Sequence, residues 1–177
     1  MSNRKRAVRK GPAHTCHPHN RYEVQIHRTS RKVLVSAARL KLVVRKVLED
    51  EQVASAEIGL AIVGDEEIHR VNREHLDHDV PTDVISFLYS AASPTTHSSG
   101  KQARRGTGLA IEGELVISDE TAAREAPRHK WPAASELELY VVHGLLHLCG
   151  YDDLTPAQRR VMRRREREVI ALIEQGR

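Results

Sequence analysis

Two histidines, His143 and His147, stand four residues apart in an apolar stretch of the sequence. On an α-helix, residues with this spacing share one face, about 6 Å apart, so both imidazoles can reach one metal ion. Gly150 follows three residues later, and glycine readily adopts the left-handed conformation that ends a helix. The chain can then turn back and bring Asp153 towards the imidazoles. This spacing is typical of zinc sites, and we expect one zinc ion per chain, held by His143, His147 and Asp153.

Three protein ligands leave a fourth coordination position for water, which is the arrangement of a catalytic zinc site. The plainer interpretation is a pair of ordinary core histidines, but two buried imidazoles need polar partners, and a metal supplies them. The residue after His143 is Gly144, where zinc peptidases carry a glutamate that acts as general base. The sequence therefore predicts a zinc-dependent hydrolase without identifying its catalytic base.

Four further polar residues are candidates for the surroundings of the metal. Asp152 is adjacent to Asp153, so their side chains should point in different directions, and we expect Asp152 to orient a histidine or brace the turn. Thr82, Asp83 and Ser86 lie at the entrance to a predicted strand. Two interpretations stay open for these three residues, namely capping of the turn and lining of the cleft near the metal.

The elements that must position these residues follow from hydrophobic periodicity. Strands are expected over residues 22–27, 58–63, 84–88 and 114–118. Helices are expected within 35–49 and over 65–75, from 119 to before Pro127, from Pro132 to about 149, and from 155 to about 174. The succession of strand 58–63, helix 65–75 and strand 84–88 favours a parallel βαβ unit. Residues 91–108, rich in Ser, Thr and Gly, are interpreted as a flexible excursion within a hairpin.

Composition and charge divide the chain in two. Five of its 28 basic residues lie among positions 1–20 without an acidic residue, and the remainder has 23 basic against 24 acidic residues. We expect residues 1–20 to be a disordered basic tail that adds affinity for nucleic acid, and residues 21–177 to be one domain. Two cysteines do not make a disulfide framework, which favours the cytoplasm, and no apolar run approaches the roughly 18 residues of a membrane span.

Three segments resemble the YbeY-type family of rRNA maturation endoribonucleases. The family motif H-G-x-L-H-L-x-G-Y-D-H matches the chain from His143 to Asp152. Residues 72–74 and 79–87 resemble the family segments N-R-x-[YF] and D-K-P-T-D-V-L-S-F, and residues 113–118 resemble G-D-[IL]-V-I-S. The resemblance extends over about residues 22–175.

The resemblance implies a metal-dependent endoribonuclease that is specific for single strands and acts in small-subunit rRNA maturation and ribosome quality control. It also implies a cytoplasmic location and an α+β fold. Together with the periodicity, we expect one domain in which a mixed sheet of about four strands packs with about five helices, with the metal site at a helix-turn. The expected partners are an rRNA precursor and the small ribosomal subunit, and the chain is expected to be a monomer with no membrane contact.

The chain departs from the family pattern at two positions. The third family ligand is a histidine, where this chain has Asp153, and the arginine that usually precedes the P-T-D-V segment aligns with Leu76. We therefore expect other cations to contact RNA, with Arg73, Arg104 and Arg105 as the candidates.

The last predicted helix holds a cluster of arginines at positions 159, 160, 163, 164, 165 and 167, interleaved with Glu166 and Glu168. A solvated helix face is the default interpretation of this cluster, and contact with RNA is the alternative. Two other functions also stay open for the whole chain. One is a metal hydrolase of another class, a peptidase or amidase, and the other is a ribosome-associated binding protein with a structural zinc.

Overall fold

A computed structural model of the chain describes residues 21–76, 79, 82–92 and 104–175. The elements in this part of the chain are β1 (Tyr22–Arg28), α1 (Ala37–Asp50), β2 (Ser55–Val63), α2 (Asp65–Leu76), β3 (Val84–Ala92), β4 (Ala110–Ser118), α3 (Asp119–His129), α4 (Ala133–Leu148) and α5 (Pro156–Gln175). The expected α+β class, with a four-stranded mixed sheet and five helices, is confirmed. The tail predicted for residues 1–20 and most of the excursion predicted for residues 91–108 lie outside the described residues.

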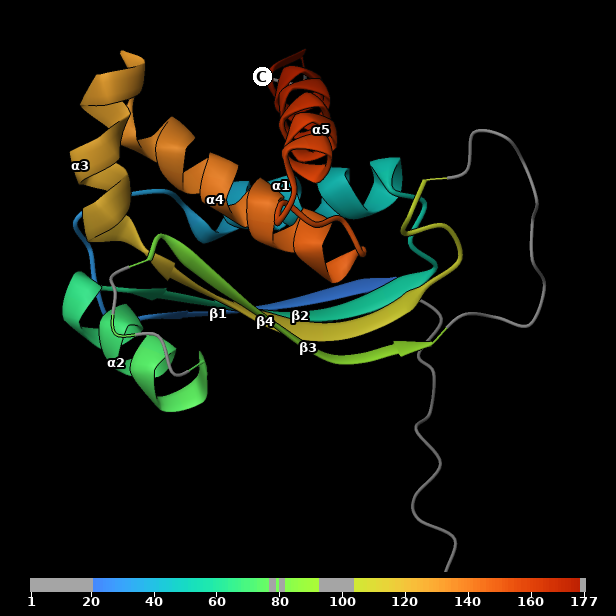
Figure 1. The fold of residues 1–177 in the computed structure, drawn as a ribbon, viewed down its shortest axis with the longest axis horizontal. Helices are drawn as coiled ribbons and strands as arrows, with labels where there is room; N and C mark the ends of the chain where they lie inside the picture. The colour runs from blue at the N-terminus through green and yellow to red at the C-terminus, as the bar shows by residue number, and fades with distance from the viewer. Residues whose placement is uncertain (1–20, 77–78, 80–81, 93–103, 176–177) are drawn as a thin grey trace, which may run out of the picture.

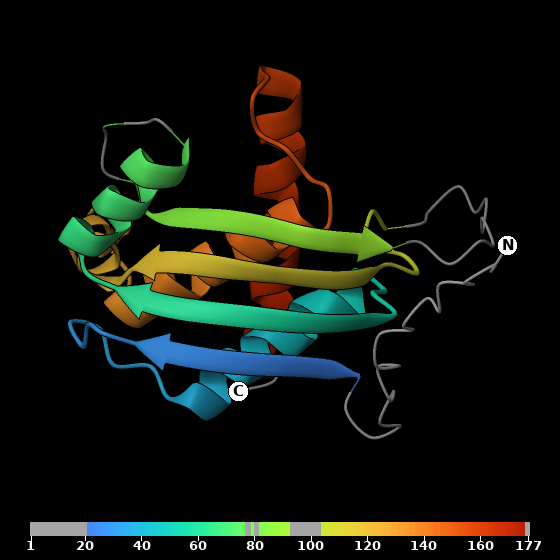
Figure 2. The ribbon, with the colours of Figure 1, turned by 90° about the horizontal axis from the view of Figure 1, so that it is seen from below.

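The four strands are arranged in the order β1-β2-β4-β3 (Figure 2). β1 and β4 both pair with β2 in parallel, whereas β3 pairs with β4 antiparallel. The predicted parallel βαβ unit is therefore wrong, because β3 runs against β2 and the two strands do not pair. The hairpin that returns from β3 inserts β4 between them. β3 is exposed from Leu88 onwards, which suits an edge strand, whereas β4 buries side chains along most of its length.

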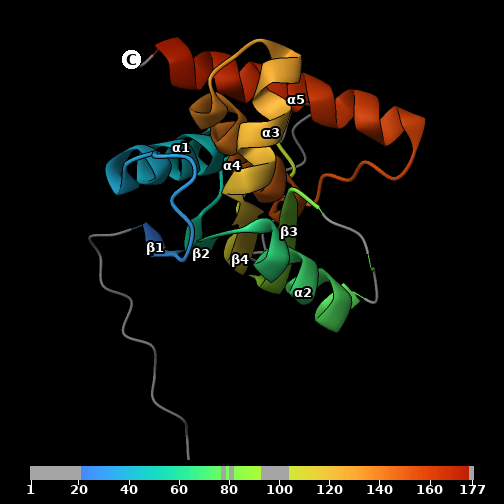
Figure 3. The same cartoon turned by 90° about the vertical axis from the view of Figure 1, so that its left-hand side faces the viewer.

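The sheet carries helices on both faces, as Figures 1 and 3 show. α1, α3, α4 and α5 lie on one side, and α2 packs against the other. Alternate residues of β2, including Ile58, Leu60 and Ile62, are buried under the larger helical layer. Val63 joins Ile68 of α2 in a second, smaller apolar cluster on the opposite face. The buried apolar side chains therefore form one large and one small cluster, on opposite faces of the sheet.

The ends of α3 illustrate one prediction that holds and one that does not. Ser118 caps the helix, since its hydroxyl accepts a hydrogen bond from the backbone N–H of Thr121 at 3.0 Å. The helix was expected to stop before Pro127 but continues to His129. Pro127 lies in the last turn, where a missing backbone donor costs one hydrogen bond only, and Lys130 closes the helix in the left-handed conformation with φ 58°.

α4, which carries both histidines, is the central helix of the larger layer and contacts α1, α3, α5, β3 and β4. It approaches the sheet closely at Gly144, where a Cβ atom would stand 2.8 Å from Leu115 Cδ2 and 3.1 Å from Ser86 Oγ. The contact fixes α4 on the sheet and leaves no room for a side chain at position 144. Among the described residues, no helix combines the length and the apolar character needed to cross a bilayer.

Candidate metal centre

His143 and His147 project from the same face of α4 and point at one another. Their Nε2 atoms are 3.0 Å apart, and the two ring centroids are separated by 4.6 Å. This is the juxtaposition that the i and i+4 spacing predicts, because both residues lie on one regular helix that ends at Leu148.

The turn after α4 brings a carboxylate to the two imidazoles. Gly150 has a φ of 91°, and the N–H of Tyr151 donates back to the carbonyl of Leu146 at 3.0 Å, which ends the helix in the expected way. Oδ1 of Asp153 then lies 4.0 Å from Nε2 of His147. The ligand atoms of the three residues all lie within 4.8 Å of one another, so this group could hold a metal ion. Two ligands of a tetrahedral zinc ion stand about 3.3 Å apart, so a small inward movement of Asp153 completes the geometry.

The outer nitrogens of the imidazoles both meet hydrogen-bond acceptors. Nδ1 of His143 lies 2.6 Å from Oε1 of Glu166, and Nδ1 of His147 lies 3.1 Å from the backbone carbonyl of Tyr151. A carboxylate and a carbonyl can only accept, so each neutral ring carries its hydrogen on Nδ1 and a lone pair on Nε2. When both rings are neutral, the two Nε2 lone pairs face each other at 3.0 Å and repel, and either a proton on one ring or a shared metal cation removes this repulsion. The donor set and its orientation therefore fit a metal ion such as zinc.

The electrostatic environment differs between the two histidines. Burial opposes the charged form of His143, but the hydrogen bond and the negative charge of Glu166 outweigh it and raise the pKa of this imidazole. Burial lowers the pKa of His147, and the neighbouring His143 lowers it further. His147 is therefore kept in the neutral form that binds metals at neutral pH.

Asp152 turns away from the imidazoles and binds the turn itself. One of its carboxylate oxygens accepts the backbone N–H of Asp153 at 2.8 Å, and the other is 3.4 Å from the side-chain amide of Gln158. Of the two roles expected for this residue, bracing of the turn fits these contacts.

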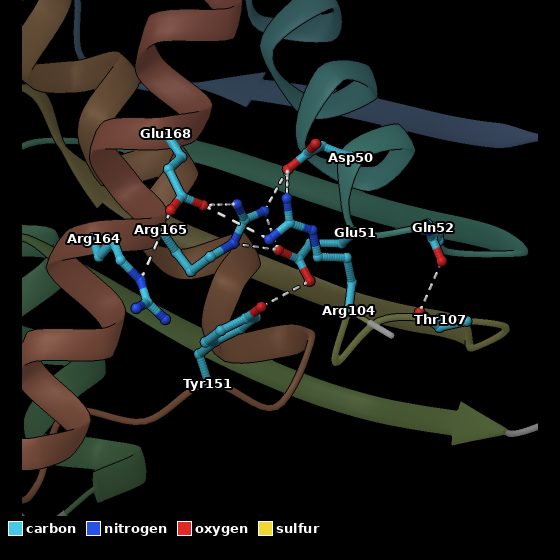
Figure 4. Close-up of polar contacts among 9 residues, drawn as sticks. All are labelled: Asp50, Glu51, Gln52, Arg104, Thr107, Tyr151, Arg164, Arg165 and Glu168. Carbon is cyan, nitrogen blue, oxygen red and sulfur yellow. Dashed lines mark hydrogen bonds and ion pairs between the residues drawn. The ribbon is translucent and has the colours of Figure 1, made fainter. Parts of the chain in front are cut away.

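Charged residues outside this turn hold it in place, and Figure 4 shows two of them, Glu51 and Arg165, beside Tyr151. Arg105 donates to the carbonyl of Gly150 at 2.6 Å and lies over the ring of Tyr151, 4.8 Å from its centroid. The hydroxyl of Tyr151 donates to the buried carboxylate of Glu51 at 3.2 Å, and Glu51 in turn pairs with Arg165 of α5 at 2.6 Å. The residue whose carbonyl orients His147 is thus anchored to α1 and α5.

A cleft with a volume of about 520 Å³ opens beside His143. Thr82, Asp83, Tyr140 and Glu166 also line it. Asp83 accepts the backbone N–H of Val84 at 2.8 Å and the hydroxyl of Thr82 at 3.2 Å. Asp83 thus accepts hydrogen bonds within the turn, and both residues line the cleft, so the two interpretations of Thr82 and Asp83 stay predictions.

Ser86 is not among the residues that line this cleft. Its hydroxyl donates to the backbone carbonyl of Gly144 at 3.3 Å and ties β3 to the histidine-bearing helix.

The three cations predicted to contact RNA are not brought to this cleft. Arg73 lines a separate pocket beside α2. Arg104 pairs with Asp50 at 3.8 Å and with Glu168 at 3.7 Å, and Arg105 holds the turn as described above. RNA contact by these residues stays a prediction, and Leu76, at the family's arginine position, is the last residue of α2.

Glu166 is the site residue that the sequence analysis missed. It was interpreted only as one acidic residue among the arginines of the last helix. Its position on α5, one turn before the buried Val169, does not single it out, and only the packing of α5 on α4 brings it to His143. A signal could have been sought in the demand of a metal-binding imidazole for an outer hydrogen-bond acceptor.

Comparisons with known proteins identify the family of the chain. The family model described as Endoribonuclease YbeY matches residues 25–174. A protein named Endoribonuclease YbeY from Chlorobium phaeovibrioides is 35% identical over 153 residues, which are 86% of this chain and 92% of the relative. One of the same name from Syntrophotalea carbinolica is 35% identical over 154 residues, which are 86% of this chain and 96% of the relative.

A solved structure shares the fold. The solution structure of a protein from Thermotoga maritima superimposes with a TM-score of 0.53 and covers 88% of this chain and 90% of its own, at 18% sequence identity. From the family model and from these relatives, which span nearly all of the domain, it follows that the chain belongs to the YbeY endoribonuclease family.

Proposed function

We propose that this protein is a zinc-dependent endoribonuclease that cleaves single-stranded RNA in the maturation of small-subunit rRNA and in ribosome quality control. The observation that carries the proposal is the group of His143, His147 and Asp153, whose ligand atoms lie within 4.8 Å of one another in a member of an endoribonuclease family. The cleft beside His143 supports the proposal, because it brings open space to one of the three ligand candidates.

In this proposal, each residue around the site has a defined task. Nε2 of His143, Nε2 of His147 and a carboxylate oxygen of Asp153 hold one zinc ion. Glu166 and the carbonyl of Tyr151 keep both lone pairs aimed inward, because each accepts the hydrogen on the outer nitrogen. Zinc bound there would act as a Lewis acid towards an oxygen of a phosphodiester.

Asp153 gives the site a chemical character that differs from three histidines. A carboxylate in place of an imidazole makes the ligand set more negative by one charge and harder as a donor. We therefore propose that the site tolerates manganese better than a site of three histidines, and acidifies a bound water less.

The cellular setting is part of the same proposal. We place the protein in the cytoplasm, as a monomer that contacts an rRNA precursor and the small ribosomal subunit and has no membrane partner. The resemblance to rRNA maturation endoribonucleases supports this setting.

The proposal is tested with purified full-length protein on matched single-stranded and duplex RNA. We expect about one zinc per chain by elemental analysis, cleavage of the single strand, and loss of cleavage with a chelator. His147→Ala should lose both zinc and cleavage, because two remaining ligands do not make a stable site. Full zinc occupancy in His147→Ala, or cleavage that survives the chelator, would refute the proposal.

A peptidase is disfavoured by the contact at Gly144. Zinc peptidases of the related ligand pattern need a glutamate at this position, and here a Cβ atom alone would stand 2.8 Å from Leu115. A casein-like substrate should therefore not be turned over. Zinc-dependent proteolysis that disappears in His143→Ala would favour the peptidase instead.

A further inference from the structure

Five of the six arginines of α5, all except Arg159, divide into two groups with different surroundings. Arg165 is only 2% exposed and pairs with Asp50, Glu51 and Glu168 (Figure 4). Arg164 lies 3.8 Å from Glu168 on the helix surface. Arg165 therefore takes part in ion pairs that hold the helix, whereas Arg164 makes one exposed pair and also lines the groove described below.

Arg160, Arg163 and Arg167 form the second group. Their spacing of three and four residues places them on one face of α5, and all three are exposed. Within the described part of the chain, none of their guanidinium groups has a carboxylate within ion-pair distance, and Nε of Arg167 donates to the backbone carbonyl of Arg163 at 3.1 Å. The face therefore carries three positive charges that are not neutralised by the domain.

These three arginines border a groove with a volume of about 1030 Å³. Trp131, Leu139 and Ile170 supply apolar surface along it, and the opposite wall comes from the end of α3 and from α4. In Figure 3, α5 lies across this part of the helical layer. Trp131 is the single tryptophan of the chain and is only partly buried, with its ring centroid 5.5 Å from that of His129. The groove thus combines cations with a partly exposed indole ring, whose Nε1 donates to the carboxylate of Glu136.

The groove adjoins the cleft beside the candidate metal centre. His129, Leu139 and Glu166 line both, and Glu166 is the residue that binds His143. Two acidic residues, Glu166 and Glu174, also line the groove, but Glu166 already shares its charge with His143. A chain-like anion that lies along α5 would therefore reach the edge of the cleft that His143 lines, where Arg124 and His129 offset part of its acidic lining.

We propose that this groove binds a single-stranded segment of the RNA substrate and leads its backbone to His143 and His147. Arg160, Arg163 and Arg167 bind phosphates, and Trp131 stacks on an unpaired base. This inference rests on the proposed endoribonuclease function and assigns to it a path for the substrate. It also replaces the default interpretation of the arginine cluster as a solvated face.

The chemistry of the groove selects a single strand over a duplex. A duplex offers phosphates but keeps its bases stacked inside, so it cannot use Trp131 or the apolar floor. An unpaired strand offers both phosphates and free base faces, and stacking on an aromatic side chain adds to the affinity of each contacted base.

The groove is tested by binding, separately from cleavage. The chelator-treated full-length protein is titrated with an oligouridylate of about eight nucleotides, a length within the usual span of single-strand sites. Fluorescence of Trp131 reports occupancy directly, because it is the single tryptophan. The variant Arg160→Gln/Arg163→Gln/Arg167→Gln should weaken binding by about a hundredfold at 0.1 M salt, and reduce the slope of log affinity against log salt by about 2, because three phosphate contacts are lost.

A control variant removes the same charge elsewhere. Lys32→Gln/Lys41→Gln/Arg45→Gln changes three exposed cations in and before α1 that do not line the groove. It should keep the affinity, the salt slope and the fluorescence change of the wild-type protein. Equal losses in the two triple variants would show that only net charge matters, and would overturn the groove.

Other outcomes separate this inference from the proposed function. Suppose that the wild-type protein cleaves RNA with zinc and that the groove variant binds and cleaves equally well. The assignment of RNA binding to the groove is then wrong, whereas the proposed function stands. If binding depends on the groove but no metal restores cleavage, the groove stands and the nuclease proposal fails. Equal affinity for a duplex of the same length, or an unchanged Trp131 signal on saturation, would overturn the single-strand assignment.

Discussion

Oε1 of Glu166 lies 2.6 Å from Nδ1 of His143, although the two residues belong to different helices and stand 23 positions apart. The contact fixes which nitrogen of the imidazole carries the hydrogen and turns the other towards His147. It also couples α5 to the candidate metal centre, since the same helix supplies the arginines that border the groove.

Glu166→Gln and Glu166→Ala should both weaken metal binding by about tenfold to a hundredfold, because partners that orient a histidine ligand contribute about this much to affinity. The glutamine variant should lose less, since its amide oxygen still accepts the hydrogen. Competition with a chromogenic chelator measures the affinity without reference to activity.

The matched control for this change is Glu49→Gln, which removes one exposed carboxylate from α1 and should leave metal affinity unaltered. If Glu166→Ala binds zinc as tightly as the Glu49 variant, the contact with His143 has no role in holding the metal.

The adjacent aspartates should respond differently to substitution. Asp153→Ala removes a ligand and should lose most of the zinc, whereas Asp153→His should retain it and show a more acidic activity profile. Asp152→Asn should keep most of the zinc, because its amide oxygen can still accept the backbone N–H of Asp153. Elemental analysis of the three variants decides the assignment, and the opposite pattern would make Asp152 the ligand.

The ligand group could be predicted from the sequence because it is local. His143, His147 and Asp153 fall within eleven consecutive residues, so the pitch of one helix and one glycine turn determine their arrangement. Glu166 could not be predicted in this way. Its proximity to His143 depends on how α5 crosses α4, which is set by the packing of many side chains and leaves no local pattern.

The order of the strands could not be predicted for a similar reason. The succession of β2, α2 and β3 has the lengths of a parallel crossover unit, and the alternation within β3 is the same in either direction. What decides the arrangement is the later strand β4, which pairs with both β2 and β3 and takes the central position. A pattern of residues within one strand contains no information about a partner that follows it in the chain.

Gly144→Ala should lower the free energy of unfolding by about 1–3 kcal/mol, the usual cost of forcing an extra methyl group into a packed core. The added Cβ atom would stand 2.8 Å from Leu115 Cδ2 and 3.0 Å from Leu115 Cδ1, so either α4 or the leucine has to move. Urea unfolding of the metal-free protein measures the change. The cost of Gly144→Ala should be smaller when it is measured in a Leu115→Ala protein than in the wild-type protein, because the clashing methyl groups are then absent. An equal cost in the two backgrounds would mean that the clash does not involve Leu115.

Removal of one partner of the buried ion pair between Arg165 and Glu51 should strongly destabilise the fold. Arg165 donates from Nη2 to Oε1 of Glu51 at 2.6 Å, and Glu51 is fully buried, so Arg165→Met leaves a carboxylate without its cation. We expect a loss of about 3–5 kcal/mol in the free energy of unfolding, measured by urea denaturation. Arg164→Met is the control. It breaks an exposed pair at 3.8 Å and should cost less than about 1 kcal/mol.

The double variant Glu51→Gln/Arg165→Met distinguishes an ionic cause from lost packing. Glutamine removes the unpaired charge but keeps an oxygen that can accept a hydrogen bond from the hydroxyl of Tyr151, which lies 3.2 Å from Glu51 in the wild-type protein. The double variant should therefore be more stable than Arg165→Met alone, because an unpaired buried charge costs more than a missing pair. The single variant Glu51→Gln completes the comparison. If the loss of stability in the double variant equals the sum of the losses in Arg165→Met and Glu51→Gln, the arginine stabilises the fold through its packing and not through the ion pair. Metal affinity adds a second readout, since Tyr151 joins this pair to His147, and the single Arg165 variant should lose zinc more readily than the double.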